Sequence, residues 1–427
     1  MQLANETIVS LEVAPLKFGV GATDEVGYDL KRLGVTKVLV LTDKHIMATG
    51  LAERVLKLIK ETGIHTDLYD ATEVEPTDKS FEAAAHWASG GNYDGFVSVG
   101  GGSVIDTAKV VNLLSTYPAP LMDYINKPIG KGNPVPGRLK PHVAIPTTAG
   151  TGSEGTPVAV LDVLDLKLKT GISHAYLRPS LGIVDPMNTV TMPAAVTAAT
   201  GFDVLTHALE SYTARPYTAR PRYANPAERP NYQGSNPISD IWSEQAIRYL
   251  GQYLRRAYLN GWDLEARTYM SLAASAAGVG FGTAGVHIPH AAGYPLAGRV
   301  RDYTPKGYDS NHPMVPHGIS VVITAPAVFR FTYATDPERH LHAAELLGVS
   351  TKGMSFEEGR AALPTAILQL MRDCNVPNGI TGLGYTKKDI PDLVEGTMKQ
   401  QRLLAVCPRD VTADIIEEVF DLSMTNW

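Results

Sequence analysis

Residues 1–190 alternate between short β-rich runs and stretches with helical spacing, and this alternation constrains the fold more than any other feature of the chain. The β-rich runs lie at residues 37–43, 65–70, 93–100, 142–148 and 181–186. Stretches with helical spacing, such as residues 50–60 and 78–88, separate them. Such alternation is typical of a parallel sheet with helices on both faces. The sequence therefore predicts an α/β domain with a Rossmann-like parallel sheet over residues 1–190.

From residue 191 onward the strand signals fade and helical periodicity takes over. The helical stretches lie at residues 194–212, 238–257, 262–280, 318–331, 337–346, 356–374, 388–401 and 411–425. A Pro- and Arg-rich insertion at 213–237 contains too much proline for a helix or a central strand. We therefore expect an all-α domain over residues 191–427, with the boundary near Pro186–Pro193.

A run of three glycines and a serine, Gly100, Gly101, Gly102 and Ser103, connects a buried strand to a helix. Bare backbone lets an anion approach closely, and the helix N-terminus presents unpaired N–H groups and the positive end of its dipole. The run is neither GxGxxG nor a P-loop, so general motif rules do not name its ligand. The alternative is a tight strand–helix turn that binds nothing.

A second small polar loop, PTTAGTGSE at 146–154, follows another predicted strand and offers the hydroxyl groups of Thr147, Thr148 and Ser153. The carboxyl ends of parallel strands meet at one edge of a sheet, where open α/β sheets bind their ligands. We therefore expect the two loops to form one cleft.

Two acidic residues lie near these loops in the sequence. Asp43 ends the first strand-like run, where a carboxylate can bind a ribose hydroxyl group and favour NAD over NADP. The alternative for Asp43 is a cap on the helix that follows. Asp106 and Lys109 lie one turn apart on the helix after the glycines and could reach into the same cleft.

The helical stretch GFDVLTHALESY at 201–212 contains Asp203 and His207, four residues apart. On a helix these two side chains lie on one face, one turn apart, and can share a divalent cation. His287, His290 and His317 are candidates for further ligands. A carboxylate with imidazoles suits Fe²⁺, Zn²⁺, Co²⁺ or Mn²⁺ rather than Ca²⁺. The alternative is a solvated Asp–His pair or an aspartate at a helix start.

The composition limits the partners and the compartment. A net charge of −6 gives no reason to expect a nucleic-acid partner. Two cysteines imply no disulfide framework, and the N-terminus has no signal-peptide or presequence pattern, so we expect a cytoplasmic protein. The low-charge stretch at 271–294 is long enough to span a membrane. Its Ala, Gly and Ser instead favour one buried helix that ends at a polar site.

Four segments in this order, GGGSVIDTAK, PTTAGTGSE, GFDVLTHALE and VPHG, resemble the iron-containing (group III) alcohol dehydrogenase family, and the resemblance covers essentially the whole chain. It implies an N-terminal dinucleotide-binding α/β domain followed by an all-α metal-binding domain. The segments NYQGSNPISDIW at 231–242 and GFGTAGVHIPH at 280–290 resemble one branch of the family. In that branch, hydride passes from a hydroxy acid to an oxo acid.

The resemblance assigns roles to particular residues. The metal ligands would be Asp203, His207, His290 and His317, with Fe²⁺ expected first and Zn²⁺ as the alternative. The NAD(H) contacts would be Asp43, Gly100, Gly101, Gly102, Ser103, Thr147 and Thr148, with Lys169 near the cofactor. Asp106 and Ser153, from the loops described above, are further cofactor candidates.

One departure from the family pattern concerns proton transfer. Most members carry a second histidine four residues after the third metal ligand, and here that position is Tyr294. Tyr294, His287 or water would then be the proton relay.

The resemblance implies a metal-dependent oxidoreductase that moves hydride between a hydroxy acid such as 4-hydroxybutyrate and an oxo acid such as 2-oxoglutarate through NAD(H). The nearest alternative is an NAD-dependent primary-alcohol dehydrogenase or aldehyde reductase. A lyase of the dehydroquinate-synthase type and a non-catalytic assembly role are more distant alternatives.

Acid substrates need a carboxylate-binding group, and arginine suits that role. The candidates, none of which the sequence singles out, are Arg178, Arg220, Arg222, Arg229, Arg299 and Arg301. The partners we expect are small-molecule substrates and a second copy of the chain, with neither nucleic acid nor a membrane.

Overall fold

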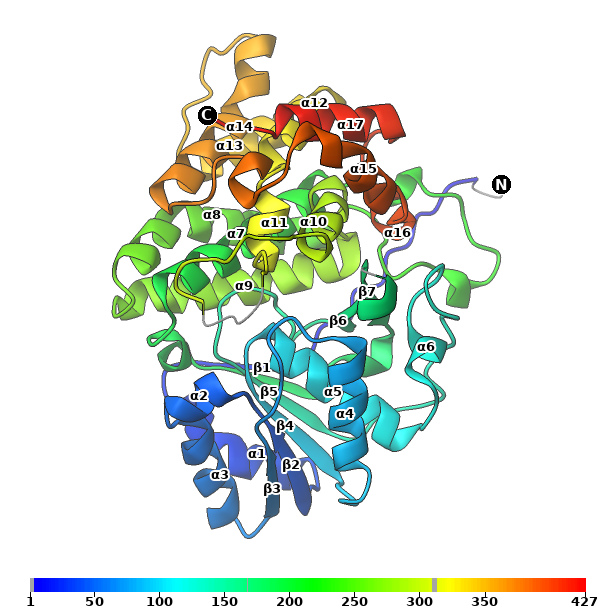
Figure 1. The fold of residues 1–427 in the computed structure, drawn as a ribbon, viewed down its shortest axis with the longest axis vertical. Coiled ribbons are helices and arrows are strands. Elements are labelled where there is room, and N and C mark those ends of the chain that lie inside the picture. Colours follow the sequence, from blue (N-terminus) through cyan, green and yellow to red (C-terminus); the bar gives the residue numbers. More distant parts are fainter. Residues whose placement is uncertain (1–3, 167, 309–312) are drawn as a thin grey trace. The chain divides into compact units, whose positions relative to one another are not determined.

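The computed structural model describes residues 4–166, 168–308 and 313–427 and divides into two compact units (Figure 1). One unit contains Val13–Met192, and the other contains Pro193–Trp427 together with the N-terminal segment that ends at Glu12. The side chain of Gln233 ties this segment to the second unit through hydrogen bonds of 3.1 and 3.0 Å to the backbone of Ser10. The sequence prediction places the same segment in the first domain and the boundary at residue 190.

The first unit is built on a six-stranded sheet in which all neighbouring strands are parallel, with the order β1-β8-β5-β4-β2-β3. Its strands are β1 (Leu16–Phe18), β2 (Lys37–Leu41), β3 (His65–Tyr69), β4 (Gly95–Gly100), β5 (His142–Pro146) and β8 (Leu181–Val184). Its helices are α1 (Val26–Arg32), α2 (Lys44–Ala48), α3 (Leu51–Glu61), α4 (Asp78–Ala88), α5 (Gly102–Thr116) and α6 (Leu121–Tyr124). The predicted parallel sheet is confirmed.

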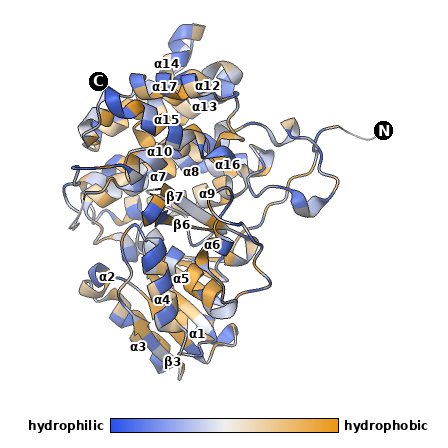
Figure 2. Ribbon diagram, turned by 45° about the vertical axis from the view of Figure 1, so that its right-hand side comes forward, coloured by the Kyte–Doolittle hydropathy of each residue, from blue (hydrophilic) through white to orange (hydrophobic). Residues whose placement is uncertain are grey.

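Helices cover both faces of this sheet. Successive residues of a strand point to opposite sides, so each strand contributes side chains to a buried cluster on each face. Val38 and Val40 of β2 pack in one buried cluster with residues of α1 and α3. Leu39 and Leu41 of the same strand pack in another cluster with residues of α4 and α5. Strands buried on both faces are mostly hydrophobic (Figure 2), and the buried Ser98 of β4 and His142 of β5 form a 2.8 Å hydrogen bond with each other.

A two-stranded antiparallel sheet of β6 (Val158–Val163) and β7 (Leu168–Ser173) lies outside the parallel sheet and is missing from the prediction. The prediction depended on strand–helix alternation, which has no place for two strands joined directly. The hairpin is attached to α5 through Asp106, whose Oδ2 accepts a 2.9 Å hydrogen bond from the backbone N–H of Val160.

The second unit is helical, and the part of it that the structure describes contains no β-strand. Its helices are α7 (Ala194–Thr213), α8 (Pro237–Leu259), α9 (Leu264–Ala284), α10 (Ile288–Gly298), α11 (His317–Val322), α12 (Ala325–Thr332), α13 (Pro337–Leu346), α14 (Phe356–Asp373), α15 (Ile390–Met398), α16 (Gln401–Leu404) and α17 (Ala413–Leu422). The expected helical second half is confirmed.

The structure divides several helices that the sequence predicts as continuous. Residues 271–294 break at Gly285, which has a φ of 90° and separates α9 from α10. A Cβ atom there would lie 2.7 Å from the ring of Tyr232, so both the backbone conformation and the space require glycine. The stretches 318–331 and 388–401 are likewise divided, into α11 and α12 and into α15 and α16. No helix in the described ranges combines the length and apolar character needed to cross a membrane.

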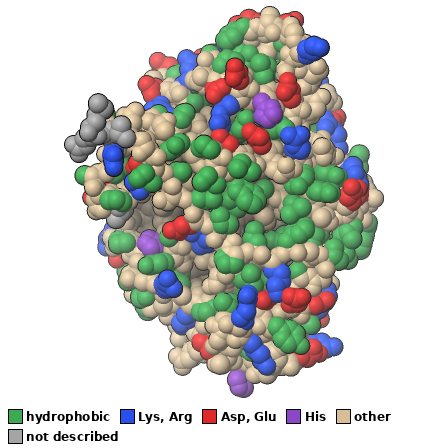
Figure 3. Space-filling view, turned by 180° about the vertical axis from the view of Figure 1, so that it is seen from behind, with side chains coloured by type: hydrophobic (Ala, Val, Ile, Leu, Met, Phe, Trp, Pro, Cys, Tyr) green, Lys and Arg blue, Asp and Glu red, His purple; other side chains and the backbone are tan. Residues whose placement is uncertain are grey.

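Hydrophobic side chains reach the surface of the helical unit. Ile241, Leu259 and Trp262, in and just after α8, are 66%, 79% and 72% exposed. Figure 3 shows hydrophobic side chains gathered on one face among charged ones. Exposed apolar patches of this kind often mark protein–protein contacts. The homo-oligomer expected from the sequence stays a prediction.

Candidate metal centre

Helix α7 carries three ionisable side chains on one face. His207 lies one helical turn after Asp203, and Glu210 lies two turns after it. Asp203, His207 and Glu210 are 2%, 5% and 0% exposed. The helix begins after Pro193 and consists largely of small and apolar residues, so most of its surface is buried in the unit. Two buried carboxylates on one helix face are costly unless cations or hydrogen bonds compensate them.

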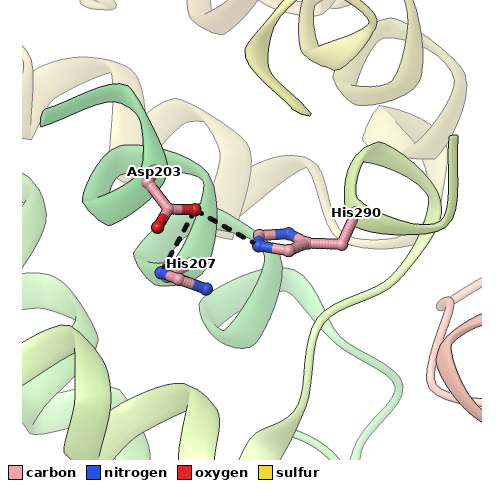
Figure 4. A group of neighbouring side chains, drawn as sticks. All are labelled: Asp203, His207 and His290. Atoms are coloured by element: carbon pink, nitrogen blue, oxygen red, sulfur yellow. Dashed lines mark ion pairs between the residues drawn. The ribbon is translucent and has the colours of Figure 1, made fainter. Parts of the chain in front are cut away.

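Three imidazole nitrogens surround one oxygen of Asp203. Its Oδ1 lies 3.7 Å from Nδ1 of His207, 3.6 Å from Nε2 of His290 and 3.8 Å from Nε2 of His317. Figure 4 shows His207 of α7 and His290 of α10 directed toward this carboxylate. Two atoms that each lie about 2.1 Å from one cation at a tetrahedral angle are about 3.4 Å apart. The observed separations therefore fit ligands of one ion.

The hydrogen-bond pattern points to the same donor set. Asp203 Oδ1, His207 Nδ1 and His290 Nε2 are buried, and none of them has a hydrogen-bond partner in the protein. Buried polar atoms are almost always paired, so unpaired atoms that face one another are those that a divalent ion would complete. These three ligand atoms lie within 4.8 Å of one another. His317 is less buried, with 21% of its side chain exposed.

Glu210 orients His290 for such a role. Its Oε1 lies 2.5 Å from Nδ1 of His290, and its Oε2 accepts a 2.5 Å hydrogen bond from the backbone N–H of His287. A carboxylate on the far nitrogen of an imidazole fixes the ring and makes the near nitrogen a better ligand. Glu210 belongs to the GFDVLTHALESY segment but was not among the residues predicted for the site. Its spacing from Asp203 and His207 is the signal that identifies it.

The ring of His207 is held between two other rings. The ring of Phe281 in α9 stacks on it with centroids 3.9 Å apart and an interplanar angle of 7°. The ring of His290 lies on it at 4.5 Å and 25°. The imidazole therefore has little freedom to turn its Nδ1 away from Asp203.

His317 reaches Asp203 because α11 packs closely on α7. It is the first residue of α11, and Gly318 follows it. A Cβ atom at Gly318 would lie 1.8 Å from the backbone oxygen of Ala199 and 2.8 Å from the backbone nitrogen of Asp203. The glycine of the VPHG motif thus allows backbone to approach backbone at the base of the site.

The pKa values follow from burial and charge in the cluster. Burial lowers the pKa of His207 to about 3, which leaves its imidazole in the neutral form that binds metals. Burial acts in the same direction on His290, but Glu210 and Asp203 outweigh it and raise the pKa to about 9. Burial would raise the pKa of Asp203, but His207, His317 and His290 together lower it. A cation at His290 must therefore displace a proton.

The two side chains expected as proton relays lie in different surroundings. The ring of Tyr294 stacks on that of His317, with centroids 5.8 Å apart. Nε2 of His287 lies 3.4 Å from the hydroxyl oxygen of Thr213, and burial lowers the pKa of His287 to about 4. His287 is therefore neither in the group around Asp203 nor charged near neutral pH, while Tyr294 adjoins a candidate ligand.

The glycine run and the second polar loop meet in the first unit. The backbone N–H of Thr147 donates a 3.0 Å hydrogen bond to the carbonyl oxygen of Gly100. A Cβ atom at Gly101 would lie 3.2 Å from the side chain of Thr148, and one at Gly102 would lie 2.6 Å from that of Thr151. Oγ1 of Thr147 is buried without a hydrogen-bond partner. The bare N-terminus of α5 and this hydroxyl group fit the phosphate-binding role.

The other cofactor candidates make hydrogen bonds within the protein. Asp43 caps α2 by accepting a 2.9 Å hydrogen bond from the N–H of Ile46, and Ser103 Oγ accepts one of 3.2 Å from the N–H of Glu75. Oγ of Ser153 donates to Asp106 at 2.5 Å. Nζ of Lys169 pairs with Glu75 and lies 3.4 Å from Asp162. The cofactor roles of Asp43, Ser103, Asp106, Ser153 and Lys169 stay predictions.

Most of the arginines considered for a substrate carboxylate already have partners. Arg229, Arg299 and Arg301 form ion pairs with Glu6, Asp392 and Asp389. Arg178 donates to the carbonyl oxygen of Gly155 at 3.2 Å. Nε of Arg220 donates to the carbonyl oxygen of Tyr217 at 3.3 Å, while its Nη1 and Nη2 are buried without a hydrogen-bond partner. Five of the six candidates thus have a partner within the protein.

The fold and the site define a class of protein. A parallel α/β unit with a glycine-rich loop at the strand ends, and a helical unit with an Asp–His group fitted to a divalent ion, belong to a metal-dependent dehydrogenase. Residues 14–186 match the family described as iron-containing alcohol dehydrogenase, and residues 231–424 match its C-terminal part. The chain belongs to the iron-containing alcohol dehydrogenase family, as the motifs predicted. It is an oxidoreductase, and its cofactors are NAD(H) and a divalent metal.

Individual relatives narrow the comparison. The chain is 48% identical over 421 residues to a hydroxyacid-oxoacid transhydrogenase of Xenopus tropicalis, covering 98% of this chain and 91% of that protein. Among solved structures it is similar to a 1,3-propanediol oxidoreductase, with a TM-score of 0.85, 30% identity and coverage of 98% and 100%. It is also similar to the structure of a sulfoacetaldehyde reductase of Bifidobacterium kashiwanohense in complex with NAD⁺. The TM-score is 0.81, the identity is 25%, and the match covers 98% of this chain and 99% of that chain.

The expectation of a cytoplasmic protein is wrong by these comparisons. The transhydrogenases of Xenopus tropicalis and Homo sapiens are both named as mitochondrial. Few cysteines argue only against an oxidising compartment, so the composition could not distinguish one reducing compartment from another.

Replacing Glu210 by Gln tests the support of His290. The variant keeps a hydrogen-bond acceptor but removes the charge, so we expect the metal affinity to fall about 10–100-fold with the fold retained. A competition titration with a chelator measures the affinity. Glu244→Gln on α8, where the glutamate is 3.7 Å from His342 at the surface, is the matched control. An affinity of Glu210→Gln equal to that of the control would contradict the role.

Replacing Gly318 by Ala tests the close approach of α11 to α7. The added methyl group meets backbone atoms that cannot turn aside, so we expect a loss of about 1–3 kcal/mol of unfolding free energy. His317 moves with α11, and metal affinity should fall at least about tenfold, the equivalent of about 1.4 kcal/mol. Gly282→Ala in α9 is the control, because a Cβ atom there meets nothing within 4 Å. Equal stability and affinity in the two variants would refute this packing argument.

Proposed function

We propose that this protein catalyses hydroxyacid–oxoacid transhydrogenation, with a hydroxy acid such as 4-hydroxybutyrate as donor and an oxo acid such as 2-oxoglutarate as acceptor. The observation that carries the proposal is 48% identity over 98% of the chain to an enzyme with that name. The segments at 231–242 and 280–290, typical of this branch, support it from the sequence.

The reaction consists of two balanced half-reactions. The hydroxy acid loses a hydride from its carbinol carbon and a proton from its hydroxyl group, so 4-hydroxybutyrate becomes succinic semialdehyde. The oxo acid gains a hydride at its carbonyl carbon and a proton on its oxygen, so 2-oxoglutarate becomes 2-hydroxyglutarate. A divalent cation supplies Lewis acidity at the substrate oxygen, and NAD(H) carries the hydride.

We assign the metal to Asp203, His207, His290 and His317. The support is the cluster of three nitrogens at 3.6–3.8 Å around one buried carboxylate oxygen. Tyr294, stacked on the ring of His317, is the residue we assign to hold the transferred proton in place of the histidine usual in the family.

We assign the pyrophosphate of NAD(H) to the glycine run at 100–102 with Thr147 and Thr148. The N-terminus of α5 has no side-chain cap, so its N–H groups are suited to an anion. The threonines line the same loop junction.

The alternative function is an NAD-dependent alcohol dehydrogenase in which the cofactor exchanges with solution. The similarity to 1,3-propanediol oxidoreductase favours it, but at 30% identity against 48% for the transhydrogenase. The two functions differ in the fate of the hydride, and this difference can be measured.

Hydride tracing distinguishes them. The metal-loaded protein is mixed with 4-hydroxybutyrate deuterated at C4, unlabelled 2-oxoglutarate and a pool of free NAD⁺. We expect deuterium at C2 of 2-hydroxyglutarate and none in the free nicotinamide pool, because the hydride stays on bound cofactor. Mass spectrometry of both products gives the answer.

The controls define the other outcomes. Label in free NADH, formed without an oxo acid, would establish the dehydrogenase alternative. Protein treated with a chelator should transfer no label, and its activity should return when Fe²⁺ or Zn²⁺ is added back. Full transfer without metal would exclude the metal-centred assignment.

A further inference from the structure

Arg402 in α16 is a cation without a counter-charge. Its side chain is partly buried, and Nη1 is buried with no hydrogen-bond partner. No ion pair in the described ranges involves it, and the groups that act on it are two tyrosines. Burial works to lower the pKa of Arg402, but Tyr232 and Tyr294 outweigh that effect and raise it. A guanidinium removed from water without a carboxylate is costly, so the position calls for an anion.

Arg402 is connected to the metal centre through Tyr294. Tyr294, which acts on the charge of Arg402, stacks on His317 with ring centroids 5.8 Å apart. α16 contacts α10, the helix that carries both Tyr294 and His290 (Figure 1). The connection is tight, because a Cβ atom at Gly396 in α15 would lie 2.7 Å from Pro295 in α10. The chain that follows α15 is thereby held against α10.

The segment at 231–242 holds the guanidinium in place. The guanidinium carbon of Arg402 lies 4.6 Å from the ring centroid of Tyr232, a cation–π contact. The same ring packs against Gly285, where the chain turns from α9 into α10. Tyr232 thus links Arg402 to the turn that precedes α10, the helix that bears His290.

We propose that Arg402 binds the substrate carboxylate, and that one guanidinium serves both the donor and the acceptor. The proposal rests on the function proposed above for the identity of the substrates. Arginine suits the role because its planar fork pairs with a carboxylate through two parallel hydrogen bonds. The unpartnered Nη1 is one of the donors that such a pair uses.

The chemistry of the two substrates explains why one arginine is enough. In 4-hydroxybutyrate, two methylene groups separate the reacting carbon from the carboxylate. In 2-oxoglutarate, two methylene groups separate the reacting carbonyl carbon from the distal carboxylate. A cation at a fixed distance from the site of hydride transfer therefore accepts both, and acceptors that lack the distal carboxylate, such as pyruvate, leave it unpaired.

The test compares acid and neutral substrates in Arg402→Gln, Arg402→Lys and Arg409→Gln. Single-turnover reduction of the bound nicotinamide is followed with 4-hydroxybutyrate and with 1,4-butanediol, which carries a hydroxymethyl group in place of the carboxylate. Arg402→Gln should lower kcat/KM for the acid by about 10²–10³-fold and change the diol by less than about threefold. Arg402→Lys should fall between the wild type and Arg402→Gln, because it keeps the charge but not the fork. Arg409→Gln removes an exposed arginine near α16 and should leave both substrates unchanged.

A binding measurement separates this proposal from the hydride chemistry. Metal-loaded protein is titrated calorimetrically with butyrate, which has the carboxylate but no hydroxyl group. We expect the wild type to bind it and Arg402→Gln to bind it at least about tenfold more weakly, with metal content and melting temperature unchanged.

Each outcome decides between the two proposals. Equal losses for acid and diol in Arg402→Gln would make Arg402 a structural residue and overturn its assignment. Hydride transfer between the acids that survives Arg402→Gln would overturn the assignment while leaving the transhydrogenase function intact. If the protein oxidises no hydroxy acid but binds butyrate through Arg402, the transhydrogenase function would be overturned and the carboxylate site would stand.

Discussion

The buried carboxylate of Asp203 is the constraint on which the helical unit depends. An ionised group at 2% exposure must be compensated, and the protein surrounds it with three imidazoles rather than with hydrogen-bond donors that would satisfy it internally. A second buried carboxylate, that of Glu210, forms a hydrogen bond with the far nitrogen of His290. The negative charges of Asp203 and Glu210 need added positive charge to compensate them, and a divalent ion supplies it.

The backbone around the site is shaped to bring these groups together. The turn at Gly285 ends α9 and lets α10 start with His290 in its first turn. Gly318 lets the start of α11 press on the backbone of α7. Neither glycine touches a ligand atom, yet each decides where a ligand-bearing helix begins. The geometry of the site therefore depends on these two glycines as well as on the side chains that face Asp203.

The parallel sheet, the helical second half and the Asp203–His207 pair could be predicted because each leaves a periodic or spaced pattern in the sequence. The β6–β7 hairpin was missed because strands joined directly do not follow strand–helix alternation. The break at Gly285 was missed because its cause is the ring of Tyr232, which is distant in sequence. Arg402 could not be given a role before folding, since its partners lie on other segments, whereas the spacing of Glu210 from Asp203 and His207 was a signal that the prediction left unused. Five of the six arginines considered from the sequence have partners within the protein, and neither local spacing nor composition could have revealed this.

The ligands that we propose for the metal come from segments that are far apart along the chain, on α7, α10 and α11. A single ion that joins them stabilises the folded state, because the ligands are brought together only there. The parallel sheet contributes no ligand to that group. The stability of the helical unit should therefore rise with the concentration of free ion. The ion supply of its surroundings thus adds to what packing alone contributes to the stability of the helical unit.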